Sequence, residues 1–266
     1  MNITPVIELS RVSKSYRRGG FFRKGERVEV LKEIDLSVRP GECVGLIGPS
    51  GSGKSTMGRI LLGLESPDDG EVRMMGESIS AETHLSKNRR RAVQVVFQNA
   101  LDSCNPRMTA REILSEPLRN FEKLKGRRLE ERIDSLLEQV GLLSSDKGKR
   151  PDRFSGGQLQ RVCIARALAP GPDLILLDEA VSALDMVVQS QILDLLDELR
   201  SDLGTAYLFV THDLRLVRRF CDRAFLLEDG RLEPFDPATF AANKHLPLLD
   251  ELVKAMPPSR PNRNRG

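Results

Sequence analysis

The 266-residue sequence contains no tryptophan, only two tyrosines and three histidines, and no long uninterrupted apolar run. A helix that crosses a bilayer needs about 20 consecutive apolar residues, so we expect no transmembrane segment. The first residues, MNITPVIELS, lack a basic region followed by an apolar stretch, and we expect no signal peptide. The chain is therefore expected in the cytosol, or on a membrane only through its partners.

Cysteine is also scarce. Cys43, Cys104, Cys163 and Cys221 lie about sixty residues apart, without a CxxC pair or a nearby pair of histidines. This spacing argues against a built-in zinc or iron–sulfur site. Nothing in it indicates a disulfide framework, which fits a reducing compartment. Cys43 and Cys163 stand in apolar segments, and we expect both to be small core residues.

A large excess of charge of one sign is missing as well. The net charge is +3, with 39% hydrophobic and 30% charged residues, which is the composition of an ordinary globular protein. The basic runs are local, at residues 87–91 and in the C-terminal tail, and such runs are typical of a solvated surface. The charge therefore does not indicate a nucleic-acid partner. The length predicts one large domain, or a domain with a subdomain.

What the sequence does contain is an alternation of strand and helix patterns. Strands are predicted at 6–16 and 30–38 around a glycine-bearing hairpin tip, and at 43–48, where a short apolar run is typical of a strand buried on both faces. Helical periodicity with dense charge marks an insertion that begins near residue 99. Further strand segments are expected at 173–179, 205–212 and 223–233, the last with a hairpin turn at Asp229-Gly230. Further helices are expected at 111–124, 129–143, 187–204 and 213–222. This order predicts an α/β fold with a mostly parallel sheet.

The strand at 43–48 leads into GPSGSGKS, residues 48–55, which fits the phosphate-loop pattern G-x-x-x-x-G-K-[ST] and opens a helical segment. Glycines let backbone N–H groups wrap a phosphate, and the helix N-terminus adds a partial positive charge. Lys54 would reach the β- and γ-phosphate oxygens, and the Ser55 hydroxyl would bind Mg²⁺. The predicted phosphate-binding residues are Gly48, Pro49, Ser50, Gly51, Ser52, Gly53, Lys54, Ser55 and Thr56.

A second apolar strand, LILLDE at 174–179, ends in two carboxylates. Such a strand end lies near the phosphate loop in doubly wound sheets. Asp178 would hold Mg²⁺ through water. Glu179 would face the attacking water as a general base or orienting acceptor, because in-line hydrolysis needs water held opposite the leaving oxygen.

A second glycine pair, in RFSGGQLQRVCIARAL at 153–168, follows Ser155 and opens another helix without a lysine. Ser155 is a good helix N-cap, and the motif predicts an anion site made of a hydroxyl and free N–H groups. One nucleotide cannot lie on the first loop and also touch this distant motif of the same chain. We therefore expect two nucleotide-binding domains to sandwich ATP head to tail.

This second motif, SGGQLQRV, resembles the signature of ATP-binding-cassette (ABC) ATPases, and other family motifs follow in the family's order over nearly the whole chain. Tyr16 resembles the aromatic residue that stacks on adenine. Gln98 resembles the glutamine that contacts Mg²⁺ and water and joins the two lobes. SALD at 182–185 resembles the loop that crosses the dimer interface, and His212 resembles the switch histidine at the γ-phosphate. Phe154 departs from the family's usual leucine, at a position outside the phosphate contacts.

The resemblance implies a set of functional residues and a fold. The implied catalytic residues are Lys54, Gln98, Glu179 and His212, and the Mg²⁺ ligands are Ser55, Gln98 and Asp178. Besides the phosphate loop, the implied nucleotide contacts are Tyr16, Ser155, Gly156, Gly157, Gln158 and Asp185. The implied fold is a P-loop NTPase with a RecA-like mixed sheet, an N-terminal antiparallel β-subdomain and an inserted helical subdomain. We expect the ABC ATPase domain at 1–250, the helical subdomain at about 99–160, and a basic, disordered tail at 251–266.

Two segments, FQNALDSCNPRMTAREIL and GGFFRKG, resemble the dipeptide, oligopeptide and nickel importer group, and the pair LLDEAVSALD and VTHDLRLVRRFCDR is most similar to ATPase subunits of bacterial nickel importers. The resemblance implies ATP and Mg²⁺ as cofactors. The implied partners are a second, similar ATPase subunit in a heterodimer, two membrane permease subunits and a periplasmic substrate-binding protein. The implied location is peripheral, on the cytoplasmic face of the bacterial inner membrane. A short helix of the membrane subunit would dock beside Gln98.

Two alternatives stay open. The same machine could import di- or oligopeptides, since no residue here would touch the cargo. A soluble, non-transport ABC ATPase acting on nucleic acid or ribosomes is more remote, because the chain has one cassette, a short helical insertion and little net charge. Direct nickel binding by this subunit is not expected, because His84 and His245 are isolated in the sequence.

Overall fold

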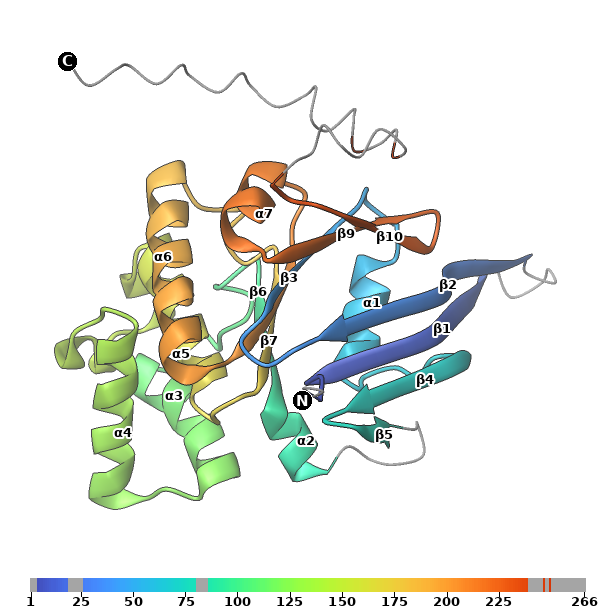
Figure 1. Cartoon of the computed structure of the whole chain (residues 1–266). Helices are drawn as coiled ribbons and strands as arrows, with labels where there is room; N and C mark the ends of the chain where they lie inside the picture. Colours follow the sequence, from blue (N-terminus) through green and yellow to red (C-terminus); the bar gives the residue numbers. More distant parts are fainter. Residues whose placement is uncertain (1–3, 19–25, 80–85, 239–245, 247–248, 250–266) are drawn as a thin grey trace, which may run out of the picture.

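The computed structural model of the chain describes residues 4–18, 26–79, 86–238, 246 and 249. Its strands form two sheets, a four-stranded sheet of order β2-β1-β4-β5 and a six-stranded sheet of order β10-β9-β3-β8-β7-β6. Helix α1 lies between the smaller and the larger sheet, and helices α3 to α6 gather on the other side of the larger sheet (Figure 1). This arrangement confirms the predicted fold class, with an antiparallel β-layer, a mixed central sheet and a helical insertion.

The smaller sheet is antiparallel throughout. Its strands are β1 (Ile7–Arg18), β2 (Glu26–Val38), β4 (Asp69–Met74) and β5 (Glu77–Ile79). The strands predicted at 6–16 and 30–38 extend further into the predicted loop, because β1 reaches Arg18 and β2 begins at Glu26; residues 19–25 between them lie outside the described residues. The pairing of β1 with β2 confirms the predicted hairpin.

The larger sheet contains both parallel and antiparallel pairs. Five of its strands are parallel, and β10 pairs antiparallel with β9 through the turn at Asp229 and Gly230, whose φ angles are 49° and 77°. Two successive residues with positive φ are the mark of the tight hairpin turn that Asp-Gly favours. The strands are β3 (Cys43–Ile47), β6 (Val93–Phe97), β7 (Leu174–Asp178), β8 (Ala206–Val210), β9 (Arg223–Glu228) and β10 (Arg231–Phe235).

Residues on the parallel strands alternate between two hydrophobic clusters, one on each face of the sheet. In β7, Ile175 and Leu177 pack with helices α3 to α7, whereas Leu174 and Leu176 pack with α1 and the smaller sheet. All five residues of β3 are buried, as the short apolar run predicts. The sheet is therefore covered on both faces, and only its strand ends are available for chemistry.

The helices follow from local signals. Thr109 and Glu112 form a capping box at the start of α3, and the helical stretch predicted over 111–124 is interrupted at Pro117, where α3 ends and the π-helical turn η1 begins. Proline lacks the N–H that would continue the helix. The helices are α1 (Lys54–Leu61), α2 (Lys87–Ala92), α3 (Ala110–Pro117), η1 (Leu118–Glu122), α4 (Gly126–Gln139), η2 (Ser144–Gly148), η3 (Pro151–Arg153), α5 (Gly156–Leu168), α6 (Met186–Leu203) and α7 (Leu214–Phe220).

Three strands are absent from the sequence predictions, namely β4, β5 and β6. Strands β4 and β5 are short and largely exposed, and β6 directly follows the basic helix α2, so their patterns are weak. The position of β6 matters for function, because it brings Gln98 to the same sheet edge as Asp178. The subdomain bounds at about 99–160 and the domain range 1–250 stay predictions, and the predicted tail at 251–266 lies outside the described residues, as do His84 and His245.

The four cysteines lie in two close pairs that their spacing does not reveal. The Sγ atoms of Cys104 and Cys163 are 3.5 Å apart, and those of Cys43 and Cys221 are 3.7 Å apart. All four are free thiols, and Cys43 and Cys163 are buried in the core, as predicted. Long-range folding thus assembles two thiol pairs, of which Cys104 and Cys163 are both buried, whereas Cys221 in the other pair is half-buried.

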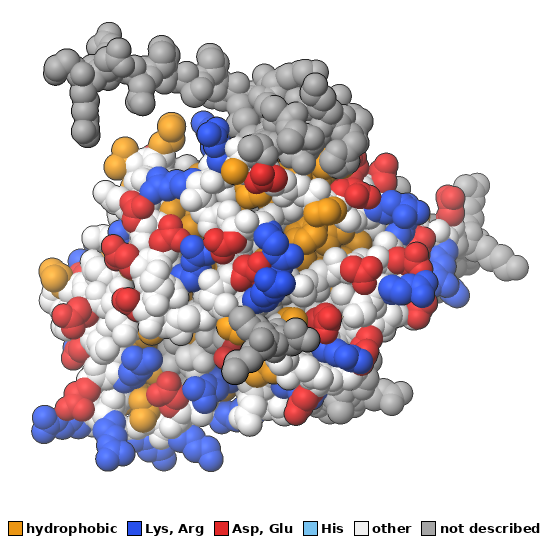
Figure 2. Space-filling model, viewed as in Figure 1, with side chains coloured by type: hydrophobic (Ala, Val, Ile, Leu, Met, Phe, Trp, Pro, Cys, Tyr) orange, Lys and Arg blue, Asp and Glu red, His pale blue; other side chains and the backbone are white. Residues whose placement is uncertain are grey.

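On the face shown in Figure 2, acidic and basic side chains are interspersed over the surface of the described residues. This view agrees with the small net charge of +3. Every helix in the described part of the chain is too short or too polar to cross a bilayer.

Candidate nucleotide-binding site

The loop between β3 and α1 has a shape that only glycine permits at two positions. A Cβ atom at Gly48 would lie 2.3 Å from the Leu227 carbonyl oxygen. Gly53 has a φ of 112°, and a Cβ there would lie 2.9 Å from the Val30 carbonyl oxygen. Because glycine has no Cβ, the backbone can pass close to these carbonyl groups and turn tightly into α1. The N–H groups of the loop are then available to bind an anion.

Lys54, the first residue of α1, folds back over this loop. Its Nζ donates hydrogen bonds to the carbonyl oxygens of Gly48 at 2.7 Å and Pro49 at 2.8 Å. Burial lowers the pKa of Lys54, while the charges of Glu179 and Asp178 act in the opposite direction. The ammonium group is thus held at the mouth of the loop by carbonyls that a phosphate could replace.

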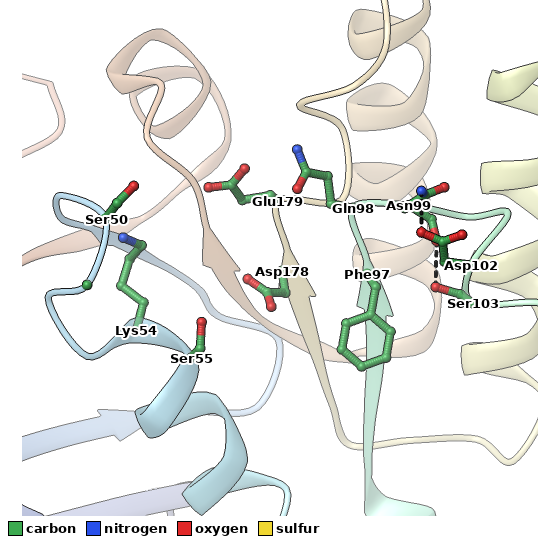
Figure 3. Close-up of a pocket in the computed structure, with 11 residues that line it drawn as sticks. Ser50, Lys54, Ser55, Phe97, Gln98, Asn99, Asp102, Ser103, Asp178 and Glu179 are labelled. Atoms are coloured by element: carbon green, nitrogen blue, oxygen red, sulfur yellow. Dashed lines mark hydrogen bonds between the residues drawn. The ribbon is translucent and has the colours of Figure 1, made fainter. Parts of the chain in front are cut away.

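A cleft of about 830 Å³ opens between this loop and the ends of strands β6 and β7 (Figure 3). Phe97 and Asp178 are paired residues at those two strand ends. The cleft is lined by Ser50, Gly51, Lys54, Ser55, Phe97, Gln98, Asn99, Asp102, Ser103, Asp178 and Glu179. The structure therefore brings together the phosphate loop, both carboxylates after β7 and Gln98, although these groups are far apart in the sequence.

The two carboxylates after β7 have different environments. Burial raises the pKa of Asp178, the neighbouring charge of Glu179 raises it further, and Lys54 acts against both. Glu179 has a φ of 50°, a left-handed conformation that is uncommon for residues other than glycine. Its backbone N–H donates to the Val210 carbonyl oxygen at 2.9 Å, so the end of β8 holds this backbone in place. Such a held conformation is a frequent feature of functional sites.

His212 lines a hollow together with Lys54 and Glu179. Its Nδ1 lies 3.3 Å from Oε1 of Glu179, and its side chain is 66% exposed. A second, smaller hollow of about 130 Å³ is lined by Ile47, Gly48, Pro49, Ser50, Lys54, Glu179 and His212. Lys54 and Glu179 line both hollows, so the two sides form one continuous site around them.

The residues available for Mg²⁺ have the right chemistry. Ser55 offers a hydroxyl, Gln98 an amide oxygen and Asp178 a carboxylate, and all three line the same cleft. Oxygen donors from one or two side chains, completed by phosphate and water, are how proteins usually hold Mg²⁺. Within the described residues, no cluster of three or more His, Cys, Asp or Glu side chains could hold a metal ion unaided.

Two expected nucleotide contacts lie outside this cleft. The Tyr16 hydroxyl donates to Oε2 of Glu65 at 2.8 Å and accepts from Nη2 of Arg59 at 3.1 Å. Thr56 is buried, and its hydroxyl accepts from the same Arg59 nitrogen atom at 3.1 Å. Hydrogen bonds thus hold the Tyr16 hydroxyl against Arg59 of α1 and against Glu65. Stacking of Tyr16 on adenine stays a prediction.

The second glycine motif is also separate from the cleft. Ser155 caps α5: its hydroxyl accepts from the Gln158 N–H at 3.3 Å, while the Gln158 side chain accepts from the Ser155 N–H at 3.1 Å. A Cβ at Gly157 would lie 2.5 Å from Cγ1 of Val188, so glycine allows α5 and α6 to pack closely. Ser155, Gly156 and Gln158 are exposed, as is Asp185, which caps α6. Their roles in nucleotide contact stay predictions.

Sequence reasoning did not name Asn99, Asp102 and Ser103 as lining residues. Asn99 Nδ2 donates to Oδ2 of Asp102 at 2.6 Å, and the Ser103 hydroxyl donates to the Asn99 carbonyl oxygen at 2.7 Å (Figure 3). The available signal was the presence of three polar residues among the five that follow Gln98. That signal has no meaning until β6 is known to end at the cleft.

Comparison with known proteins agrees with this geometry. Residues 31–182, more than half of the chain, match the family model described as ABC transporter. The chain is 46% identical over 260 residues to the nickel import ATP-binding protein NikE of Rhodospirillum rubrum, with 97% of this chain and 94% of that protein covered. It is 43% identical to the protein of the same name from Escherichia coli O157:H7, with 96% and 97% covered.

Solved structures show the same fold. The ATP-binding cassette MJ0796, described as a dimer in a post-hydrolysis state bound to ADP and Pi, has a TM-score of 0.74 and 34% identity, covering 85% of this chain and 96% of that one. The cbiO1 protein of Clostridium perfringens, part of the transporter complex cbiONQ, has a TM-score of 0.78 and 25% identity, covering 94% and 99%. The phosphate loop, the carboxylates after β7 and these relatives together lead to one conclusion: the chain belongs to the ABC transporter family and is an ATP-binding protein of transport-coupled ATPase type.

Proposed function

We propose that this chain is the ATP-hydrolysing subunit of a bacterial nickel(II) importer. The observation that carries the ATPase part is the single site around Lys54 and Glu179, which joins the phosphate loop, Asp178, Gln98 and His212. The nickel cargo is supported by the two near-full-length relatives named as nickel import ATP-binding proteins. Among residues 4–18, 26–79 and 86–238, no cluster of three or more His, Cys, Asp or Glu side chains could hold nickel, and we propose that the partners recognise the cargo.

The residues divide the chemistry among themselves. The β3–α1 loop and Lys54 would bind the β- and γ-phosphates, and Ser55, Gln98 and Asp178 would hold Mg²⁺, which neutralises charge on the phosphate oxygens when bound. Glu179 would accept a hydrogen bond from the attacking water and orient it in line with the leaving oxygen. His212, 3.3 Å from Glu179, would contact the γ-phosphate.

Completion of the site calls for a second ATPase subunit. Ser155 and Gly156 are exposed, Gly157 is half-buried, and all three lie outside the cleft that contains Lys54. In a head-to-tail dimer, this motif would touch the γ-phosphate held by the partner's phosphate loop. The solved relative described as dimeric with ADP and Pi supports this arrangement. We propose a heterodimer with a similar ATPase subunit.

The membrane partners would dock beside Gln98. Phe97 is 43% exposed and Leu101 is 56% exposed, so two large apolar side chains flank the polar residues at this rim of the cleft. A short helix from a permease subunit could bury both side chains. The full machine would contain two permease subunits and a periplasmic binding protein, with this chain peripheral on the cytoplasmic face of the inner membrane.

Uptake of radioactive nickel tests the proposal directly. Cells lacking this gene would be complemented with wild type or with Glu179→Gln, and nickel and dipeptide uptake would be measured in the same strains. We expect nickel uptake to fall on deletion, to return with wild type and not to return with the variant. Loss of peptide uptake with nickel uptake unchanged would contradict the cargo while leaving the ATPase assignment intact.

A further inference from the structure

Three side chains on one face of α5 contact three backbone carbonyl groups of the segment that carries Gln98. The spacing is three residues on both sides, so the contacts form a regular ladder. The contacts are Gln160 Nε2 to the Phe97 oxygen at 3.3 Å, Cys163 Sγ to the Ala100 oxygen at 3.8 Å, and Arg166 Nη1 to the Ser103 oxygen. Residues spaced by three lie on one side of a helix, which explains why a single helix can make all three contacts.

The segment held by this ladder is itself a compact unit. Asn99 organises it: its Oδ1 accepts from the Leu101 N–H at 3.2 Å, and its carbonyl oxygen accepts from the Ser103 N–H at 3.1 Å. The Asn99 and Ser103 side chains add the bonds drawn in Figure 3. Residues 99–104 therefore form one turn that can move as a body with the helix to which it is bonded.

Of the three ladder contacts, the one made by Gln160 lies nearest to Gln98 in the chain. Its side chain is 2% exposed, and its bond goes to the carbonyl group immediately before Gln98. Gln98, by contrast, is exposed, and its side chain makes no hydrogen bond to any residue that the structure describes. The backbone on either side of Gln98 is thus fixed from α5, while its amide is left to face the cleft.

We propose that Gln160 is a positioning residue that, with Cys163 and Arg166, makes the Gln98 segment a rigid extension of α5. This inference rests on the proposed function, in which Gln98 contacts Mg²⁺ and water. Ser155, at the N-terminus of α5, would meet the nucleotide held by the partner subunit. Gln160 lies five residues further along, about 7.5 Å in a helix, and adjusts Gln98 at this chain's own nucleotide. The helix α5 therefore couples the two ATP sites of the dimer.

The test combines two variants with their double variant. Gln160→Leu removes the Nε2 hydrogen-bond donor and replaces it with an apolar side chain of similar size. We expect it to lower kcat for ATP about tenfold, within the range of coupling between contacting residues. The Mg²⁺ concentration needed for half-maximal activity should rise, while nucleotide binding in EDTA should stay unchanged. Gln98→Ala should give a similar loss, and the double variant should lose no more than Gln98→Ala alone.

Val162→Ala supplies the matched control. Val162 is fully buried in the same helix and takes no part in the ladder, so its truncation lowers stability without touching Gln98. We expect a lower melting temperature with kcat and the Mg²⁺ dependence unchanged. Should Gln160→Leu fail to fold, Arg166→Gln at the other end of the ladder carries the same test with the same expected outcomes.

Several outcomes would overturn the proposal. If the losses of Gln160→Leu and Gln98→Ala multiply in the double variant, Gln160 acts independently of Gln98. If Gln160→Leu leaves kcat and the Mg²⁺ dependence unchanged while Gln98→Ala impairs both, the positioning role is wrong and the proposed function stands. If Gln98→Ala and Glu179→Gln both hydrolyse ATP normally, the proposed site itself fails.

Discussion

The Nδ1 atom of His212 lies 3.3 Å from Oε1 of Glu179, although the two residues are 33 positions apart in the chain. The contact arises because Glu179, in its left-handed conformation, donates its backbone N–H to Val210, at the end of the strand that leads into His212. The end of β8 therefore holds both Glu179 and His212, the residues proposed to act on the attacking water and the γ-phosphate.

Replacing Glu179 by glutamine should abolish turnover while preserving nucleotide binding. The amide keeps the shape of the carboxylate but cannot take a proton from water, so we expect kcat to fall by about 10²–10⁴. The variant should accumulate as an ATP-bound dimer, visible by size-exclusion chromatography with ATP. Glu198→Gln, an exposed change on α6, is the control and should behave as wild type. Normal hydrolysis by Glu179→Gln would remove Glu179 from the water-orienting role.

Adding a single methyl group at Gly48 should disrupt the phosphate loop. The new Cβ would lie 2.3 Å from the Leu227 carbonyl oxygen and 2.7 Å from the Ser52 hydroxyl. We expect Gly48→Ala to destabilise the protein by about 1–3 kcal/mol and to weaken nucleotide binding in a fluorescent-nucleotide titration. Gly148→Ala is the matched control, because a Cβ there meets nothing within 4 Å. If both variants bind the nucleotide with equal affinity, the loop can shift to accommodate the added methyl group, and the prediction is wrong.

The proposed contact of Ser155 with the partner's nucleotide can be tested separately from its function as a helix cap. Ser155 and Thr109 each cap a helix in a capping box, so Ser155→Ala and Thr109→Ala should each cost about 1 kcal/mol of stability. Only Ser155→Ala should also reduce ATPase activity, because only Ser155 is proposed to meet the partner's nucleotide. Thermal unfolding and steady-state ATPase assays of both variants provide the comparison. A parallel loss of activity in Thr109→Ala would indicate a purely structural effect.

The ion pair between Glu42 and Arg223 should make stability depend on pH. Arg223 donates to the two Glu42 oxygens at 2.5 and 3.0 Å, and the Arg39 N–H adds a bond at 2.9 Å. Burial acts to raise the pKa of Glu42, but these donors outweigh it and the net pKa is lowered. A lowered carboxyl pKa contributes stability above its ordinary value, about 4.3, and this contribution disappears as pH falls through the folded-state pKa.

We therefore expect Glu42→Gln to lower the free energy of unfolding at pH 7 by about 1–3 kcal/mol, with a smaller difference at pH 3.5. Urea unfolding followed by circular dichroism at both pH values measures it. Glu33→Gln is the control, since Glu33 pairs with Arg11 on the surface, where both side chains are more than half exposed and the pair contributes little. If Glu42→Gln lowers the free energy of unfolding by the same amount at both pH values, the lowered pKa of Glu42 is contradicted.

The sequence alone was sufficient for the features that depend on neighbours in the chain. The glycine pattern before Lys54, the N-cap at Ser155, the Asp-Gly turn at 229–230 and the buried strand at 43–48 are all visible there, because each follows from local backbone geometry or from a short run of apolar residues. The short motifs in their family order, above all the phosphate loop and SGGQLQRV, carried the family resemblance and with it the fold.

The tertiary structure alone decided what depends on contacts between distant residues. The pairing of β6 with β7 brings Gln98 and Asp178 to one cleft, and the ladder from Gln160 to Phe97 joins α5 to that cleft. The cysteine pairs and the ties of Tyr16 to Glu65 and Arg59 are likewise invisible in sequence spacing. A linear pattern specifies which residues share a face of a helix or strand, but which faces meet is determined only when the whole core packs together.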